Sequence, residues 1–379
     1  MRILYLIMLY NGDINGGHTY KMATVQIIRD IVGYENLDIV LSELDTSEWN
    51  ANVVLRLKSY QGILSKLRNL LQGNITQISN KDIKMVVNLI NKKKYDLVIF
   101  GNSETGRLIK IIKNKCNVKT LTLYNDIITD VINEKKKDNF DIKYLPIWNN
   151  EIKAEKIDSQ LTDYIITLHE RDGSLLKKYL HRDADAYLPI ILEDKYKENV
   201  KLYKNKNELR LLFVGAYTWN VNVIAVKWFC EEVLSELEEY NITFNVAGYK
   251  MEQLKKEEWT KNYRNLNIIG TVDDLSQIYN EADVVVLPII SGSGMKVKTA
   301  EALMYGKRVL GTKEALVGYD EISDCECNTG EEFKNRIAEL YQQEFEKFCV
   351  DNRKYFENNF SMKATKEKMK IILNEISNK

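Results

Sequence analysis

Short, continuously apolar runs alternate with helix-length amphipathic stretches along this chain. Runs rich in Val, Ile and Leu are typical of strands buried on both faces, and a helix between two strands makes the strands parallel. The sequence therefore predicts an α/β fold with doubly wound parallel sheets. The expected strands are Ile3–Met8, Leu37–Leu41, Leu97–Gly101, Leu121–Tyr124, Tyr164–Leu168, Leu211–Gly215, Phe244–Gly248, Leu266–Gly270, Val284–Pro288 and Arg308–Gly311.

The strands form two series, so two domains are expected. A chain of 379 residues is longer than one hydrophobic core usually supports. Residues 193–206 are charged, carry little apolar periodicity and separate the two series, which is typical of a linker. We therefore expect one domain over residues 1–192 and a second over residues 207–360.

The strongest candidate site is a glycine-rich turn between the strand Val284–Pro288 and the helix that follows. Ser291-Gly292-Ser293-Gly294 leads into that helix, whose unpaired N–H groups and positive dipole end favour a phosphate. Lys296 and Lys298 add positive charge at the same end. We place Glu301 about two turns into the helix, where it could accept hydrogen bonds from a ribose.

This turn matches neither of two other phosphate-binding motifs. It lacks the third glycine of a dinucleotide fingerprint and the Gly-Lys-Ser/Thr of a Walker loop. An ordinary connection between a strand and a helix would also explain the two glycines on their own.

A second candidate loop follows the first strand. Its glycines, Gly16 and Gly17, would permit close approach of the backbone to a ligand. His18 is the one of three histidines best placed for acid–base chemistry, although a plain turn before a helix is an alternative. In the second half, Tyr217 and Trp219 could stack on a sugar ring or serve in packing alone.

Charge and cysteine content exclude several classes of protein. The formal net charge is zero, which argues against a nucleic-acid-binding protein. Residues 51–120 nevertheless carry an excess of +11, with fourteen basic and three acidic residues. This region is either a solvated surface or attracted to an anionic membrane or a phosphate-bearing acceptor. The five scattered cysteines do not form a metal-binding pattern, and we expect a cytoplasmic protein, at most peripheral at the inner face of the membrane.

From Asn267 to Thr312 the sequence resembles the donor-binding half of family 4 glycosyltransferases, which have the GT-B fold of two facing Rossmann-like domains. The likeness is weaker elsewhere, and it implies that residues 361–379 form a helix crossing back to the first domain. It also implies base contacts from the strand ending at Gly270, diphosphate contacts from the lysines, and ribose contacts from Glu301. The implied donor-binding residues are Gly16, Gly17, Gly215, Asn220, Gly270, Thr271, Val272, Ser291, Gly292, Ser293, Gly294, Met295, Lys296, Val297, Lys298 and Glu301.

The same resemblance implies an activity. Such enzymes transfer a sugar from a nucleotide-sugar with retention and without a divalent metal, and we expect a glycan, lipid-linked or protein-linked acceptor. Abundant Lys, Asn and Ile are typical of an AT-rich bacterial genome, so the expected setting is bacterial surface-polysaccharide or glycoconjugate synthesis. Two positions depart from the family: Ser293 replaces an acid, and Tyr124 replaces a histidine. The implied catalytic residues are His18, Asn125, Asp126 and Lys298.

Three alternatives stay open at this point. An inactive accessory protein of the same fold would bind a nucleotide-sugar or a partner transferase without turnover. A sugar-nucleotide epimerase would need a site richer in acid–base residues than three histidines suggest. A phosphorylase would need a pyridoxal-phosphate lysine that the sequence does not reveal.

Overall fold

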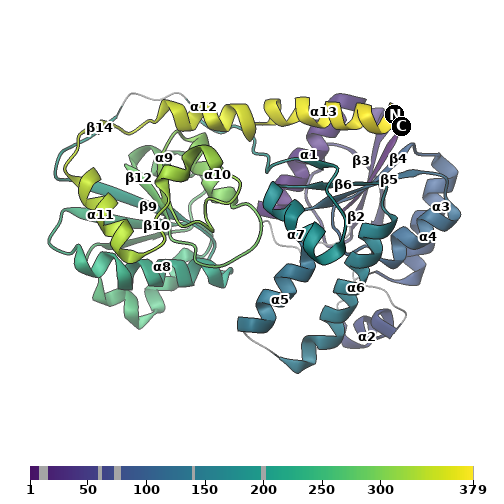
Figure 1. Ribbon diagram of the computed structural model, residues 1–379, viewed down its shortest axis with the longest axis horizontal. Helices are drawn as coiled ribbons and strands as arrows, with labels where there is room; N and C mark the ends of the chain where they lie inside the picture. Colours follow the sequence, from purple (N-terminus) through teal and green to yellow (C-terminus); the bar gives the residue numbers. More distant parts are fainter. Residues whose placement is uncertain (8–15, 59–61, 72–77, 139–140, 198–201, 379) are drawn as a thin grey trace. The chain divides into compact units, whose positions relative to one another are not determined.

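The computed structural model describes residues 1–7, 16–58, 62–71, 78–138, 141–197 and 202–378, and it divides into two compact units (Figure 1). Unit 1 contains Met1–Ile191 together with Met362–Lys379, and unit 2 contains Leu192–Ser361. Within the described residues, no helix has the length and apolar character needed to cross a membrane.

Unit 1 is built on a seven-stranded parallel sheet with the order β3-β2-β1-β4-β5-β6-β7. The strands are β1 Ile3–Ile7, β2 Leu37–Ser42, β3 Asn52–Leu57, β4 Leu97–Phe100, β5 Lys119–Tyr124, β6 Tyr164–Thr167 and β7 Ala186–Tyr187. The two edge strands, β3 and β7, were not expected from the sequence. β3 is mostly part-exposed and includes the polar residues Asn52 and Arg56, and β7 is only two residues long, so neither gives a buried apolar run.

Helices cover both faces of this sheet. They are α1 Gly16–Val32, α2 Ile63–Leu71, α3 Asn80–Lys93, α4 Arg107–Lys115, α5 Ile128–Asp138, α6 Leu145–Leu161, α7 Glu170–Leu180 and α13 Met362–Asn378. α3 and α4 place Val86, Ile90 and Ile109 in one core with Leu4 and Phe100 of the strands. The C-terminal helix α13 lies along α1, and Lys119 Nζ donates to Ile376 O at 2.8 Å.

Unit 2 is built on a five-stranded parallel sheet with the order β11-β10-β9-β12-β13. Its strands are β9 Leu209–Val214, β10 Ile242–Ala247, β11 Leu266–Gly270, β12 Val284–Leu287 and β13 Arg308–Gly311. The helices are α8 Asn220–Glu232, α9 Ser276–Glu281, α10 Val297–Met304, α11 Gly330–Tyr341 and α12 Val350–Asn359. Each of the ten strands expected from the sequence is present in one of the two sheets.

The segment expected to be a linker is partly built into unit 2, so that expectation was wrong. β8 Tyr203–Lys204 pairs antiparallel with β14 Phe345–Glu346. Lys204 is only 1% exposed, and its ammonium donates to the carbonyls of Asn205, Tyr341 and Gln343 at 2.6, 2.9 and 2.7 Å. Main-chain oxygens thus replace the water that a lysine normally requires, which a charge-rich sequence does not reveal.

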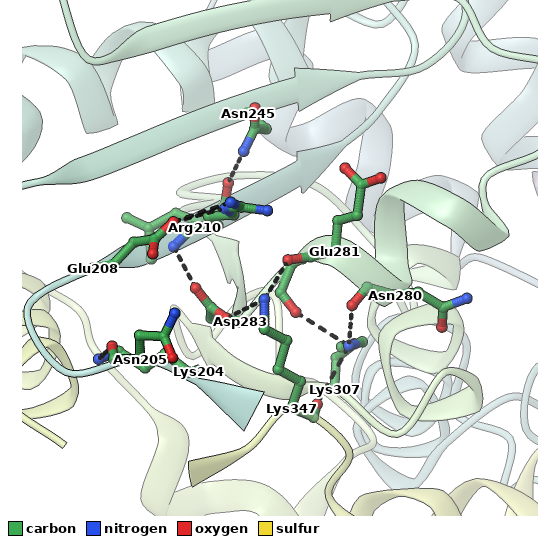
Figure 2. Close-up of polar contacts among 12 residues, drawn as sticks. Lys204, Asn205, Glu208, Arg210, Asn245, Asn280, Glu281, Asp283, Lys307 and Lys347 are labelled. Carbon is green, nitrogen blue, oxygen red and sulfur yellow. Dashed lines mark hydrogen bonds and ion pairs between the residues drawn. The ribbon is translucent and has the colours of Figure 1, made fainter. Parts of the chain in front are cut away.

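A second buried lysine, Lys307, precedes β13 and lies near Asp283, which precedes β12 (Figure 2). Lys307 Nζ donates to the carbonyls of Asn280, Ala282 and Lys347 at 3.3, 3.1 and 3.3 Å. Lys347 in turn forms an ion pair of 2.9 Å with Asp283, a buried carboxylate. Because the carboxyl ends of parallel strands lie at the opposite edge of the sheet, these lysines stabilise the fold rather than the candidate site.

Candidate functional site

The glycine-rich turn connects β12 to α10 at the carboxyl edge of the unit 2 sheet. Gly292 and Gly294 have φ values of 140° and 61°, which other residues rarely adopt. The helix begins at Val297 and has no side-chain cap at Lys296. Its first N–H groups therefore lie where parallel α/β proteins bind ligands, and they can receive an anion.

Lys296 does not point toward such an anion, contrary to the expectation from sequence. Its ammonium donates to the carbonyls of Ser293 and Gly294 at 3.0 and 2.9 Å and to Glu314 Oε1 at 2.6 Å. With only 13% of its side chain exposed, Lys296 holds the turn in shape from inside. The turn needs this support because its own glycines are conformationally free.

Lys298 is the cation that the turn presents. Its Nζ donates to Asn222 Oδ1 and lies 4.3 Å from the centre of the Phe213 ring. Asn222 is 7% exposed and is fixed by its own hydrogen bond of 2.8 Å to Ala216 O. Burial lowers the pKa of Lys298 to about 7, partly offset by the nearby Glu301. A polyanion beside this lysine would favour the ammonium form.

Glu301 lies about one turn into α10, not two, because the helix starts three residues later than Gly294. Its carboxyl group is part-buried, and burial raises its pKa. Lys195 and Lys298 oppose that rise. A carboxylate so close to the helix start can accept hydroxyl hydrogen bonds from a group attached to a bound diphosphate.

The other expected donor-binding residues of unit 2 occupy the same edge of the sheet. Gly215 N donates to Ala247 O at 3.0 Å, and Gly248 N donates to Gly270 O at 2.8 Å. A Cβ on Gly248 would lie 2.1 Å from Gly215 O, so glycine lets the loops after β9 and β10 approach closely. Thr271 is held by Glu252, which accepts from its N–H and hydroxyl at 3.0 and 2.9 Å.

The remaining unit 2 candidates differ in exposure. The exposed ones are Asn220 at the start of α8 and Ser291 in the turn, whereas Val272 and Val297 are part-buried. Met295 is 7% exposed and packs against Gly318. Of the two aromatic residues, Trp219 is 55% exposed, and the Tyr217 hydroxyl donates to Glu257 at 3.2 Å.

In unit 1, Gly16, Gly17 and His18 form the first turn of α1 rather than a loop, and residues 13–15 lie outside the described residues. His18 is 4% exposed, its Nε2 lies 3.0 Å from Ser47 Oγ, and its ring packs edge-on against Trp49. Burial lowers the pKa of His18, so the neutral form predominates at pH 7. Its proposed catalytic role stays a prediction.

Asn125 and Asp126 follow β5 at the carboxyl edge of the unit 1 sheet. Asn125 Nδ2 donates to Gly101 O at 3.2 Å, which ties the loop after β5 to the loop after β4. Tyr124 is 1% exposed, and its hydroxyl donates to Asp158 at 3.0 Å. Tyr124 is therefore part of the support beneath this edge.

Two fully buried acidic residues of α6, Glu155 and Asp158, hold these loops, and neither was expected from the sequence. Glu155 accepts hydrogen bonds from Ile128 N, Thr129 N and the Thr129 and Ser103 hydroxyls, at 2.7, 2.8, 2.6 and 3.2 Å. Asp158 accepts from the hydroxyls of Thr105 and Tyr124, and burial raises its pKa to about 8. The one sequence signal was that two acids three residues apart share a face of a helix with little amphipathic character, so that this face need not be exposed.

Comparison with known proteins defines the class. Residues 208–343 match the family model described as "Glycosyl transferases group 1". A search of curated proteins finds no sequence that matches this chain. Among solved structures, the fold is similar to that of sucrose-phosphate synthase from Thermosynechococcus elongatus, with 13% identity, a TM-score of 0.71 and 100% of each chain covered.

Two further structures share the fold. The Anabaena protein Alr3699/HepE, solved in complex with UDP, has 11% identity and a TM-score of 0.67, covering 99% of this chain and 100% of that one. WaaG, a glycosyltransferase involved in lipopolysaccharide biosynthesis, has 12% identity and a TM-score of 0.66, covering 98% and 99%. The chain has the GT-B fold. It is a glycosyltransferase whose second unit carries the group 1 domain.

Proposed function

We propose that this chain is a retaining glycosyltransferase that moves a sugar from a nucleotide-sugar to a glycan, lipid-linked or protein-linked acceptor in bacterial surface-polysaccharide or glycoconjugate synthesis. The observation that carries the proposal is the pairing of Lys298 with the start of α10, one turn before Glu301. HepE was solved in complex with UDP, and WaaG is involved in lipopolysaccharide biosynthesis, so these similar folds support a nucleotide-sugar donor and a surface glycan.

In the proposed reaction the donor diphosphate lies at the start of α10 and the ribose at Glu301. Negative charge grows on the diphosphate as the bond to the sugar breaks. The Lys298 ammonium and the helix N–H groups are fixed in advance, and fixed donors aimed at developing charge lower a barrier by several kcal/mol. Gly270, Thr271 and Val272 would contact the base through their backbone.

A thermal-shift screen of the full chain against UDP-, GDP- and dTDP-sugars tests the donor. A ligand that binds the native state raises the melting temperature with increasing concentration. The donor that shifts the wild type should shift Lys298→Ala much less at the same concentration. Donor hydrolysis or transfer then separates an enzyme from an accessory protein, and the absence of any shift and any turnover would refute the proposal.

We also propose that turnover needs no divalent metal, because Lys298 and the helix supply the positive charge that the leaving diphosphate requires. Activity in excess EDTA should then equal activity in added Mg²⁺. A loss of activity in EDTA that Mg²⁺ restores would contradict this part.

Peripheral attachment to an anionic membrane is the last part of the proposal. α2 lies within the basic region and exposes Leu64, Leu67 and Leu71 by 82%, 50% and 80%. Their spacing puts them on one helical face, as in helices that lie at a membrane surface. Vesicles of phosphatidylglycerol should sediment the wild type but not Leu64→Asp/Leu71→Asp. Vesicles of phosphatidylcholine should sediment neither protein.

A further inference from the structure

The loop after β4 in unit 1 is held unusually firmly. The carboxylates of Glu155 and Asp158 accept hydrogen bonds from Ser103 and Thr105, on either side of Glu104. Gly106 presses against α6, since a Cβ there would lie 2.7 Å from Ala154 Cα. A rigid loop at the carboxyl edge of a parallel sheet is where a ligand-binding side chain is expected.

Two buried oxygens at this edge have no hydrogen-bond donor among the described residues. They are Oε2 of Glu104 and Oδ1 of Asn125. Both belong to loops that are tied together by the hydrogen bond from Asn125 to Gly101 O. Buried acceptors without donors are rare in native proteins because each loses its water without replacement. Their arrangement indicates a ligand that supplies donors.

The charge of the surroundings narrows the class of ligand. The charges of Glu155 and Glu151 act on Glu104, opposed by that of Lys21, whose ammonium donates to Asn102 Oδ1 at 3.1 Å. Burial and these acids raise the pKa of Glu104 to about 7. A phosphate would bring only acceptors and negative charge to this place, whereas a sugar hydroxyl brings a donor without charge.

We propose that Glu104 and Asn125 bind hydroxyl groups of an uncharged sugar on the acceptor, so that the reactive end of the acceptor is a neutral glycosyl unit rather than a phosphorylated one. This inference rests on the proposed function and deepens it. Glu104 is then a specificity-determining residue. Glu155 and Asp158 are positioning residues that act through the loop.

The test measures sugar binding by saturation-transfer NMR on the full chain saturated with UDP. The probes are methyl glycosides of glucose, galactose and N-acetylglucosamine, with glucose 6-phosphate and glucosamine for comparison. At least one neutral glycoside should bind. Its affinity should be about tenfold higher than that of glucose 6-phosphate and at least equal to that of glucosamine. At a pH about one unit above the pKa of Glu104, Glu104→Gln should weaken the binding of that glycoside about tenfold, because the acceptor loses its charge. Glu35→Gln, an exposed site at the opposite edge of the same sheet, should leave it unchanged.

Other outcomes overturn the inference. These are no binding of any neutral glycoside, preferential binding of the phosphate or the amine, or unchanged binding by Glu104→Gln. Circular dichroism and melting of each variant establish that it is folded, and Glu104→Asp should retain part of the affinity. UDP binding is measured separately. If the chain binds the neutral glycoside but not UDP, the proposed donor site is refuted and this inference stands.

Discussion

The two sheets place opposite charges at the same structural position. At the carboxyl edge of the unit 2 sheet, the turn before α10 presents Lys298 and a helix start. The corresponding edge of unit 1 presents Glu104 above the buried Glu155 and Asp158. One architecture thus carries a cation at this edge in one unit and an acid in the other, because side chains, not the fold, set the charge of each edge.

The largest expected effect is on the stability of unit 1. Glu155→Ala removes the acceptor for four hydrogen bonds in a fully buried place, and we expect a loss of about 3 kcal/mol in the free energy of unfolding. Urea denaturation measures this loss. Glu151→Ala, one turn earlier on α6 and only part-buried, is the control and should cost less than about 1 kcal/mol. Equal effects would show that Glu155 does not hold the loops.

Removal of the unit 2 cation should affect chemistry instead. Lys298→Ala should lower turnover at saturating donor by more than about tenfold, since the lost ammonium stabilises charge that develops in the transition state. Steady-state kinetics against the donor identified by thermal shift measures it. Lys296→Ala should mainly lower the melting temperature, because Lys296 braces the turn. Unchanged turnover in Lys298→Ala would show that the cation at the unit 2 edge does not contribute to the reaction.

The pH dependence of donor binding is the next expected effect. With a pKa of about 7, Lys298 loses its proton as the pH rises above neutrality. A bound diphosphate requires the ammonium, so donor affinity should be highest below pH 7 and fall up to about tenfold per pH unit above it. Titration calorimetry from pH 6 to 9 measures the slope. The same experiment on Lys298→Met should give a flat profile, and a slope retained there would assign it to another group.

The smallest expected effect concerns Asn222, which positions Lys298. Asn222→Ala should weaken donor binding about fivefold, the loss expected for one hydrogen bond to an oriented ammonium. It should also move the midpoint of the pH profile to lower pH, because the ammonium loses an acceptor that favours it. If Asn222 served only in packing, Asn222→Ala would lower donor affinity without moving the midpoint of the pH profile. Asn222→Asp should move that midpoint to higher pH.

Much of the fold followed from apolar periodicity. β1 and β12 are continuous apolar runs buried on both faces, and any such run must enter a covered sheet. β3 escaped prediction because most of its residues are only part-buried or exposed. β8 escaped because it is two residues long and pairs with β14, which lies far along the chain. Periodicity reports burial on a face, so it cannot find a strand that is only partly buried.

Only part of the candidate site could be predicted from the sequence. The glycine turn and its helix were visible because backbone requirements restrict the residues that can form them. The different roles of Lys296 and Lys298 could not be predicted, because in the sequence both are simply cations two positions apart. Glu314 and Asn222, distant in sequence, determine which lysine is turned inward and which is presented.

The two parallel sheets and the place of the glycine-rich turn could be read from the amino-acid sequence, because strand burial and glycine conformation are local properties. The electrostatics of the two edges, in contrast, arise only in the folded protein. Folding buried Glu155 and Asp158 beneath one edge, satisfied Lys204 with carbonyl oxygens, and left Glu104 Oε2 without a donor among the described residues. The energy of a charge depends on which groups surround it, and those groups are brought together only by folding.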